Sequence, residues 1–252
     1  MSLLINFLIR YTDVEIMYDL HAHILPGIDD GPELLESAIE MAAAAAAWGT
    51  TVMIATPHRK DVVENSSISF VQDCLKSLNK ELETRNVGLE ILLGMENHLG
   101  SDLPDAFSRG EALTIAGSAY ALVELPFFGK PNYMEDVLYK IQALGLTPVL
   151  VHPERIELIQ RNPGLLDKFI QQGMLSQITA GSIVGHFGAR VKEFVQRLLQ
   201  EGLVHVIASD THSPVGPRSP LLSAGVDLAA RLVGKKEALS MVLDTPQNIL
   251  KI

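Results

Sequence analysis

The stretch MYDLHAH, residues 17–23, is a short apolar run that ends in two histidines. Side chains alternate with a period of two along a strand, so His21 and His23 are expected on one face of the extended chain. Two imidazoles on one face can chelate a metal ion, and Asp19 is placed to orient one of the rings as a hydrogen-bond acceptor. The stretch therefore predicts a strand whose carboxyl end carries chemistry.

Six further apolar runs follow the same plan, and each ends in polar residues or at Gly or Pro. Amphipathic segments with a period of 3.6 residues separate them, and apolar stripes within 35–46, 137–144 and 191–199 predict helices. Strands that alternate with helices indicate βαβ units and a parallel sheet. The six runs are TVMIATPH (51–58), LEILLGMEN (89–97), AYALVELP (119–126), TPVLVHPE (147–154), LSQITAGS (175–182) and LVHVIASDTH (203–212).

Polar residues end nearly every predicted strand, and this separates a barrel from an open sheet. In a barrel the carboxyl ends of many strands meet at one mouth, whereas an open sheet gathers its site at one switch point. We therefore predict an α/β fold, a distorted seven-stranded (β/α)7 TIM-like barrel that forms a single domain over residues 17–252. Met17 directly precedes the first strand, so residues 1–16 are interpreted as an N-terminal appendage, either an upstream start or added residues.

The residues at the strand ends share one chemistry, that of metal ligands. A single histidine at a strand end is more often structural than a ligand, but five of the 8 histidines occupy such ends together with three carboxylates. Tetrahedral zinc takes four ligands and octahedral manganese six, so nine candidates imply a cluster of two or three divalent ions. The candidates are His21, His23, Asp30 from the first loop, His58, Glu96, Glu124, His152, Asp210 and His212.

Three arginines follow these candidates in the predicted loops, namely Arg59, Arg155 and Arg218. Clustered divalent ions indicate hydrolysis, and guanidinium groups offer a bidentate fork suited to phosphate. The chain has no GxxxxGK[ST] loop, which argues against a nucleotide-driven kinase or NTPase. It also has no CxxxxxR motif, so a phosphocysteine mechanism lacks its nucleophile, and Cys74 is interpreted as a packing residue.

The composition excludes several other classes of protein. Twenty Lys and Arg against 30 Asp and Glu give a formal charge of −10 over 252 residues, which disfavours nucleic acid as a partner. No segment resembles a membrane span, so no membrane insertion is expected. A single cysteine allows no internal disulfide, which is typical of a reducing compartment, and we expect a cytoplasmic protein. The oligomeric state cannot be read from the sequence.

Taken together, these motifs resemble the PHP (polymerase and histidinol phosphatase) superfamily of metal-dependent phosphoesterases. Within it, the chain is most similar to the manganese-dependent bacterial protein tyrosine phosphatases of capsule and exopolysaccharide loci, the CpsB/CapC type. The resemblance runs from Met17 to about the C-terminus. The stretches that carry it are DLHAHILPGIDDGP (19–32), ATPHR (55–59), GMEN (94–97), VHPER (151–155), TAGSIVGHFG (179–188) and ASDTH (208–212).

The resemblance implies three metal ions, partitioned among the nine candidates. The first would be held by His21, His23, Glu96 and Asp210, the second by Glu96, Glu124 and His152, and the third by Asp30, His58 and His212. It further implies direct attack on phosphorus by a metal-bridging hydroxide, without a covalent enzyme intermediate. Arg155 and Arg218 would contact the phosphate, and Arg59 matches the family less well. Asp210 or a metal-bound water would assist proton transfer.

The resemblance also implies the substrate, a phosphotyrosine cluster in the tail of an autophosphorylating bacterial tyrosine kinase that controls polysaccharide export. Manganese is the expected metal, with iron or zinc as alternatives. Two other functions stay open at this point. One is a small-molecule phosphatase of the same superfamily, such as one acting on histidinol phosphate. The other is a non-catalytic module that binds a metal or a partner, which the complete set of nine candidate ligands disfavours.

Overall fold

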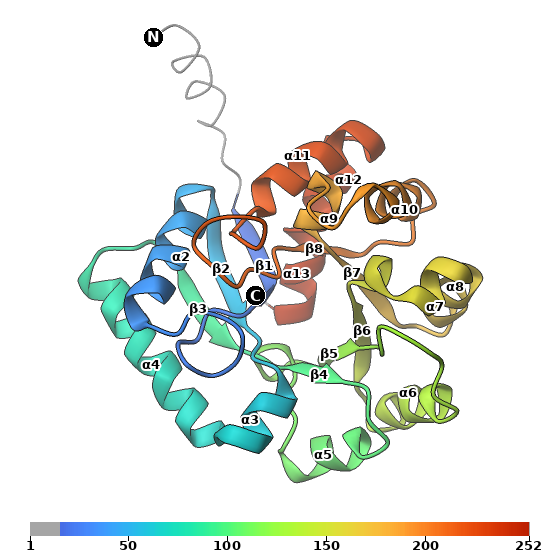
Figure 1. Cartoon of the computed structure of the whole chain (residues 1–252), viewed down its shortest axis with the longest axis horizontal. Coiled ribbons are helices and arrows are strands. Elements are labelled where there is room, and N and C mark those ends of the chain that lie inside the picture. The colour runs from blue at the N-terminus through green and yellow to red at the C-terminus, as the bar shows by residue number, and fades with distance from the viewer. Residues whose placement is uncertain (1–15, 252) are drawn as a thin grey trace, which may run out of the picture.

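Strands and helices alternate along the chain, with the strands inside and most of the helices outside (Figure 1). The structure is a computed structural model that describes residues 16–251. The predicted appendage, residues 1–16, lies outside the described residues except for Ile16. No helix in the described part is long and apolar enough to cross a membrane. The strands are β1 (Met17–Ala22), β2 (Thr50–Ala55), β3 (Glu90–Leu93), β4 (Glu96–His98), β5 (Tyr120–Glu124), β6 (Thr147–Val151), β7 (Leu175–Thr179) and β8 (Val206–Ala208).

The helices begin and end close to the predicted stripes. The stripes within 35–46, 137–144 and 191–199 become α2 (Leu35–Ala47), α6 (Met134–Ala143) and α10 (Ala189–Gln200), as their 3.6-residue period predicts. The other helices are α3 (Arg59–Asn65), α4 (Ile68–Thr84), α5 (Leu103–Arg109), α7 (Glu157–Arg161), α8 (Gly164–Gln171), α9 (Ala180–Val184), α11 (Leu222–Val233), α12 (Lys235–Ser240), α13 (Asp244–Leu250) and the 3-10 turns η2 (Ile115–Gly117) and η3 (Pro153–Arg155).

The strands form two parallel sheets, and the prediction of one closed seven-stranded barrel needs correction. One sheet has the order β1-β2-β3 and the other the order β4-β5-β6-β7-β8, which makes eight strands in the described chain. Isolated parallel bridges join the sheets at both junctions, Ala22 with Thr211 and His58 with Glu96. The α/β class and the parallel strands are confirmed, but the hydrogen-bonded ladder is not continuous around the ring.

The extra strand arises because the predicted run 89–97 divides at Gly94. Its first half, β3, pairs with β2, and its second half, β4, pairs with β5. A Cβ atom at Gly94 would lie 2.8 Å from the Ile54 side chain, so the chain here passes too close to β2 for any larger residue. Gly94 N still donates to Ala55 O at 2.8 Å, which holds the break against the neighbouring strand.

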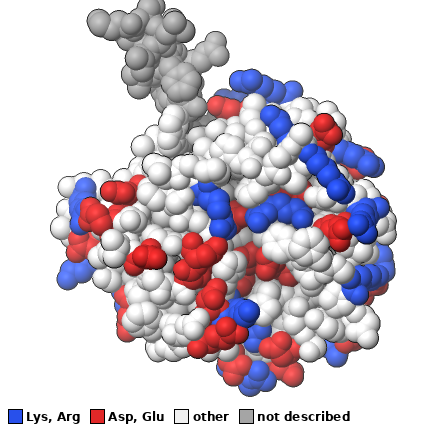
Figure 2. All heavy atoms as spheres, in the orientation of Figure 1, with Lys and Arg blue, Asp and Glu red and all other residues white. Residues whose placement is uncertain are grey.

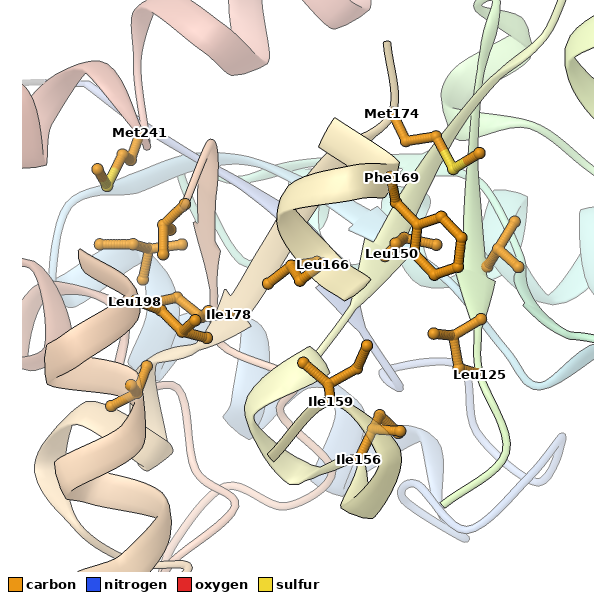
Figure 3. Close-up of a cluster of buried hydrophobic side chains, with 14 of the residues drawn as sticks. Leu125, Leu150, Ile156, Ile159, Leu166, Phe169, Met174, Ile178, Leu198 and Met241 are labelled. Carbon is orange, nitrogen blue, oxygen red and sulfur yellow. The ribbon is translucent and has the colours of Figure 1, made fainter. Parts of the chain in front are cut away.

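Apolar side chains fill both the interior of the ring of strands and the layer between strands and helices. Leu20, Ile54, Leu122, Val149 and Val206 form an interior cluster that Ile249 of α13 joins. A larger outer cluster packs helices onto the five-stranded sheet, and Figure 3 shows part of it, including residues of α8, β6, β7 and α10. The interior is thus a packed core rather than a channel, which leaves the carboxyl ends of the strands as the place for chemistry.

Helices α9 and α11 approach each other closely at Gly225. A Cβ atom there would lie 2.6 Å from Ala180 Cβ and 2.9 Å from Ala180 Cα. Ala180 follows β7 directly and opens α9, whose Ser182 donates to Glu154 Oε1 at 2.6 Å. The absence of a side chain at Gly225 therefore fixes where α9 lies behind the turn that carries Arg155.

We expect Gly225→Ala to destabilise the protein by about 1–3 kcal/mol, because the added methyl group overlaps backbone as well as side-chain atoms of Ala180. The measurement is urea unfolding followed by circular dichroism. Gly88→Ala is the control, since nothing lies within 4 Å of the position that its methyl group would take, and it should stay within about 0.5 kcal/mol of the parent. A Gly225→Ala protein as stable as the parent would contradict this account of the α9–α11 contact.

Candidate metal centre

The carboxyl ends of strands from both sheets meet at one polar mouth. Within the residues described, all nine predicted ligands lie in contact with other members of the set, and most are buried. All of them except Asp210 fall into three groups in which the ligand atoms lie within 4.8 Å of one another. The groups are His21, His23 and Glu96; Glu96, Glu124 and His152; and His23, Asp30, His58 and His212.

The first group is centred on two histidines from the end of β1. His21 Nε2 and His23 Nε2 lie 3.1 Å apart. Glu96 Oε2 lies 3.5 Å from the first and 3.3 Å from the second, and Asp210 Oδ1 lies 3.8 Å and 3.7 Å from them. Four ligand atoms of three residue types thus converge on one small volume, which is the donor set expected for a divalent transition metal.

The second group shares Glu96 with the first. Glu96 Oε1 lies 2.9 Å from His152 Nε2, while its other oxygen faces His21 and His23. Glu124 Oε1 lies 3.6 Å from the same His152 nitrogen. One carboxylate therefore reaches both groups, and it has the position of a bridging ligand.

The third group lies on the side of the mouth nearest the loop after β1. Asp30 Oδ1 lies 3.3 Å from His58 Nε2 and 3.1 Å from His212 Nε2. His23 belongs to this group as well, with its ring stacked on His212 at a centroid distance of 3.9 Å. Asp30 is 53% exposed, so this part of the centre is the most open to solvent.

Two acceptors orient the histidine rings of β1, and neither was predicted for this role. His21 Nδ1 lies 2.8 Å from Gln177 Oε1, and His23 Nδ1 lies 2.7 Å from Asp29 Oδ2. Such contacts place the N–H at Nδ1 and leave the Nε2 lone pair facing the centre. The prediction that Asp19 orients an imidazole ring is wrong, because Asp19 Oδ1 accepts from the backbone N–H of Ser209 at 2.9 Å.

A sequence signal existed for one of these acceptors and not for the other. Asp29 is adjacent to Asp30 in the loop that leads to α2, where a carboxylate is expected as a helix cap. Gln177 is an uncharged residue in the middle of β7, and no pattern in the run 175–182 distinguishes it. Its role depends on β7 lying where its side chain can reach β1, which only the fold provides.

The carboxylates make the centre strongly attractive to positive charge. Burial opposes a proton on His23, but Asp29 and Glu96 outweigh burial and raise the pKa of His23 to about 9. Burial likewise opposes a proton on His58, yet Asp30 and Glu96 raise its pKa to about 11. Burial alone would raise the pKa of Glu96, but the charge of His21 and the hydrogen bond from His152 hold it well below its usual value.

Two ligand candidates have backbone conformations that side chains seldom adopt. His152 has φ 36° and Asp210 has φ 51°, both in the left-handed region. Each follows the last residue of its strand by one or two positions, where the chain turns across the mouth. Strain of this kind persists where the surroundings fix the side chain, and it concentrates at functional sites.

Two of the three predicted arginines lie at the mouth. Arg155 Nη1 donates to Asp210 Oδ2 at 2.8 Å, and Arg218 Nη1 donates to Asp30 Oδ2 at 2.8 Å. The structure does not bring Arg59 to the centre, since its buried side chain donates to Asp102 at 2.7 Å.

Two aromatic rings contact the Arg155 guanidinium. Its central carbon lies 5.3 Å from the centroid of the Phe127 ring and 4.5 Å from that of Phe187. The Phe127 ring also stacks on His152, at a centroid distance of 5.5 Å. These cation–π contacts hold the guanidinium in place, while its N–H groups make directional hydrogen bonds.

Comparison with known proteins identifies a family for this arrangement. The family described as "Capsular polysaccharide synthesis, CpsB/CapC" matches residues 17–251. The chain is 38% identical over 197 residues to tyrosine-protein phosphatase YwqE of Bacillus subtilis, covering 78% of each chain. It is 28% identical over 240 residues to tyrosine-protein phosphatase CpsB of Streptococcus agalactiae, covering 93% of this chain and 98% of that one.

A solved structure agrees with the sequence relatives. The chain matches a chain from crystal structures of YwqE from Bacillus subtilis and CpsB from Streptococcus pneumoniae. The TM-score is 0.88 and the sequence identity 33%, and the match covers 93% of this chain and 94% of the other. Those proteins are described as unique metal-dependent tyrosine phosphatases. The chain belongs to the CpsB/CapC family of capsular polysaccharide synthesis.

Proposed function

We propose that this chain is a metal-dependent protein tyrosine phosphatase that acts in the cytoplasm on the phosphotyrosine-containing tail of a bacterial tyrosine kinase of capsule or exopolysaccharide synthesis. The observation that carries the proposal is the meeting of three ligand groups and two arginines at one mouth. The family and its relatives, which are named tyrosine-protein phosphatases, support the same reaction.

The residues of the centre fit divalent ions. With Nδ1 of His21 and His23 directed at Gln177 and Asp29, the two Nε2 lone pairs face each other at 3.1 Å. Only a proton or a cation between such lone pairs makes the contact favourable, and the nearby carboxylates favour positive charge there. We propose that the nine predicted ligands hold two or three ions, with manganese expected and iron or zinc as alternatives.

The chain's own residues bind and orient the phosphate ester. Divalent ions supply charge that stabilises a phosphoryl group in transfer, and they activate water. Arg155 and Arg218 carry planar forks that bind phosphoryl oxygens in pairs. Burial would raise the pKa of Asp210, but the charges of His21 and His152 lower it, and the carboxylate holds Arg155.

Exposed apolar side chains around the mouth favour a protein substrate over a metabolite. Phe128 and Val215 are 79% and 76% exposed, the highest values among the large hydrophobic residues of the described part. They follow β5 and β8, and Leu34, which is 65% exposed, lies in the loop after β1. Apolar side chains spread over three loops suit contact with an extended peptide, whereas a metabolite would need an enclosed pocket.

Removal of one ligand tests the metal centre. We expect His152→Ala to lower phosphate release from a phosphotyrosyl peptide by at least about 100-fold, because even partners of metal ligands are worth about 10- to 100-fold. Bound metal, measured by mass spectrometry, should fall in parallel, and a chelator should abolish the parent's activity. His205→Gln is the control, because His205 Nδ1 accepts from Ser176 N at 3.2 Å outside the centre. Full activity of metal-free protein would exclude the metal-dependent reaction.

A comparison of substrates tests the protein phosphatase assignment. Manganese-loaded protein should have a higher kcat/KM for a phosphotyrosyl peptide than for histidinol phosphate, because the open mouth offers contacts only to the larger substrate. The measurement is phosphate release with both substrates under the same conditions. A preference for histidinol phosphate would assign the chain to small-molecule metabolism and leave the metal centre in place.

A charge-conserving substitution tests the arginine that contacts the two phenylalanines. We expect Arg155→Lys to lower kcat/KM for aryl phosphates about 10- to 100-fold, because lysine keeps the charge and loses one of the paired hydrogen bonds, worth about 1.5–3 kcal/mol. Bound metal should stay unchanged. Arg161→Lys is the matched control, since Arg161 is 71% exposed and pairs with Glu157. Equal activity of the Arg155→Lys and Arg161→Lys proteins would remove Arg155 from the phosphate site.

A further inference from the structure

One side of the mouth is rich in basic side chains, in a chain where acidic residues outnumber basic ones 30 to 20. Residues 180–192 and 211–226, which follow β7 and β8, contain no Asp or Glu. The two segments meet where His186 Nδ1 lies 3.0 Å from Pro217 O. The surface they form with the turn after β6 is the basic rim, defined by Arg155, Arg190, Lys192 and Arg218.

Arg190 is the member of the basic rim whose side chain makes no polar contact that would stabilise the described fold. Its side chain is exposed and makes no hydrogen bond or ion pair with any described residue. Four other arginines on the helices or at their ends are exposed too, but each pairs with a glutamate. They are Arg85 with Glu36, Arg109 with Glu111, Arg161 with Glu157 and Arg197 with Glu201.

The position of Arg190 on its helix is electrostatically unfavourable. Arg190 and Lys192 lie in the first turn of α10, which has no acidic residue. The amino end of a helix carries partial positive charge and favours acidic side chains, so two cations there oppose the helix dipole. Arg231 also lacks a partner among the described residues, but it lies in the last turn of α11, where a cation is favoured. Lys192 Nζ donates to Val184 O at the end of α9, at 3.2 Å, whereas Arg190 adds positive charge beside the mouth without a structural benefit.

The opposite side of the mouth has the reverse charge. The loop after β1 and the start of α2 carry Asp29, Asp30, Glu33 and Glu36, and no Lys or Arg lies between 24 and 58. Figure 2 shows acidic side chains gathered on the α2 side of this face, and basic ones over the α9–α10 side. An extended anionic ligand that enters the mouth is therefore repelled from one side and attracted to the other.

We propose that the basic rim binds a second anionic group of the substrate, a carboxylate or a further phosphate on the peptide next to the reacting phosphotyrosine. This rests on the proposed function of the centre. Arg155 and Arg218 engage the reacting phosphate, while Arg190 and Lys192 lie on the helix that follows Phe187 and contact the flanking segment. The peptide thus runs from the mouth over α9 and the start of α10.

Kinetics with matched peptides tests the basic rim. Three peptides of one length carry a single phosphotyrosine flanked by glutamines, a single phosphotyrosine flanked by glutamates, or two phosphotyrosines among glutamines. We expect the manganese-loaded parent to prefer both anionic peptides over the glutamine peptide by at least about fivefold in kcat/KM at low salt. The preference should fall towards one at about 0.5 M NaCl, where charges are screened within a few Å. The ratio of the two anionic peptides shows whether carboxylate or phosphate is the better ligand.

Two substitutions on one helix separate the rim from general charge effects. Arg190→Gln should reduce the preference for anionic peptides about twofold to fivefold, as expected for one exposed charge pair. Arg197→Gln removes the same charge from the last turn of α10, about 10 Å further along the helix, and should leave the preference unchanged. Turnover of p-nitrophenyl phosphate should be the same in both variants and the parent.

The outcomes distinguish this inference from the proposed function. Equal kcat/KM for the glutamine and anionic peptides, or an equal loss of preference in Arg190→Gln and Arg197→Gln, would overturn the basic rim while leaving phosphatase activity intact. A parent protein inactive on every aryl phosphate would overturn the proposed function instead. In that case fluorescence anisotropy of labelled peptides still decides the inference, since the parent should bind the anionic peptides more tightly than Arg190→Gln does.

Discussion

The buried carboxylate of Glu96 is the contact on which the rest of the site depends. It faces His21 and His23 with one oxygen and His152 with the other, so it joins histidines from both sheets. The same residue opens β4 and forms the isolated bridge to His58. Glu96 N donates to Pro57 O, just after β2, and Glu96 also pairs with Leu122 of β5. One residue therefore contacts both sheets.

A cluster of this kind constrains the fold as well as the chemistry. Several carboxylates and imidazoles packed out of water repel or desolvate one another unless positive charge balances them. The raised pKa values of His23 and His58 show that the carboxylates favour positive charge here. Partners in turn fix the rings, with Gln177 on β7 behind His21 and Asp29 behind His23. Residues from β1, β7 and the first loop must therefore reach the mouth together, which requires the parallel arrangement of the strands.

Sequence patterns predicted which ligand candidates meet at the mouth, because each lies at the polar end of an apolar run and parallel strands place such ends at one edge. The strand break at Gly94 could not be predicted, since it depends on the distance to the Ile54 side chain. The arginines show the same limit. Arg59 and Arg155 each follow a ligand candidate, yet the first is buried against Asp102 and only the second is held at the mouth. Residue types indicate the chemistry, whereas packing decides which of two similar arginines lies at the site.

The charge of the protein gives the basic rim its importance. A chain with a formal charge of −10 repels an anionic phosphate ester at long range, so the approach of substrate depends on where the positive charges lie. Several surface cations pair with acidic residues on their own helix and project little field. Cations without an acidic partner near the mouth therefore have a larger effect on the local electrostatic potential than their number suggests. The acid-free segments after β7 and β8 thus provide a local route of favourable potential into a centre that the protein as a whole would shield from its substrate.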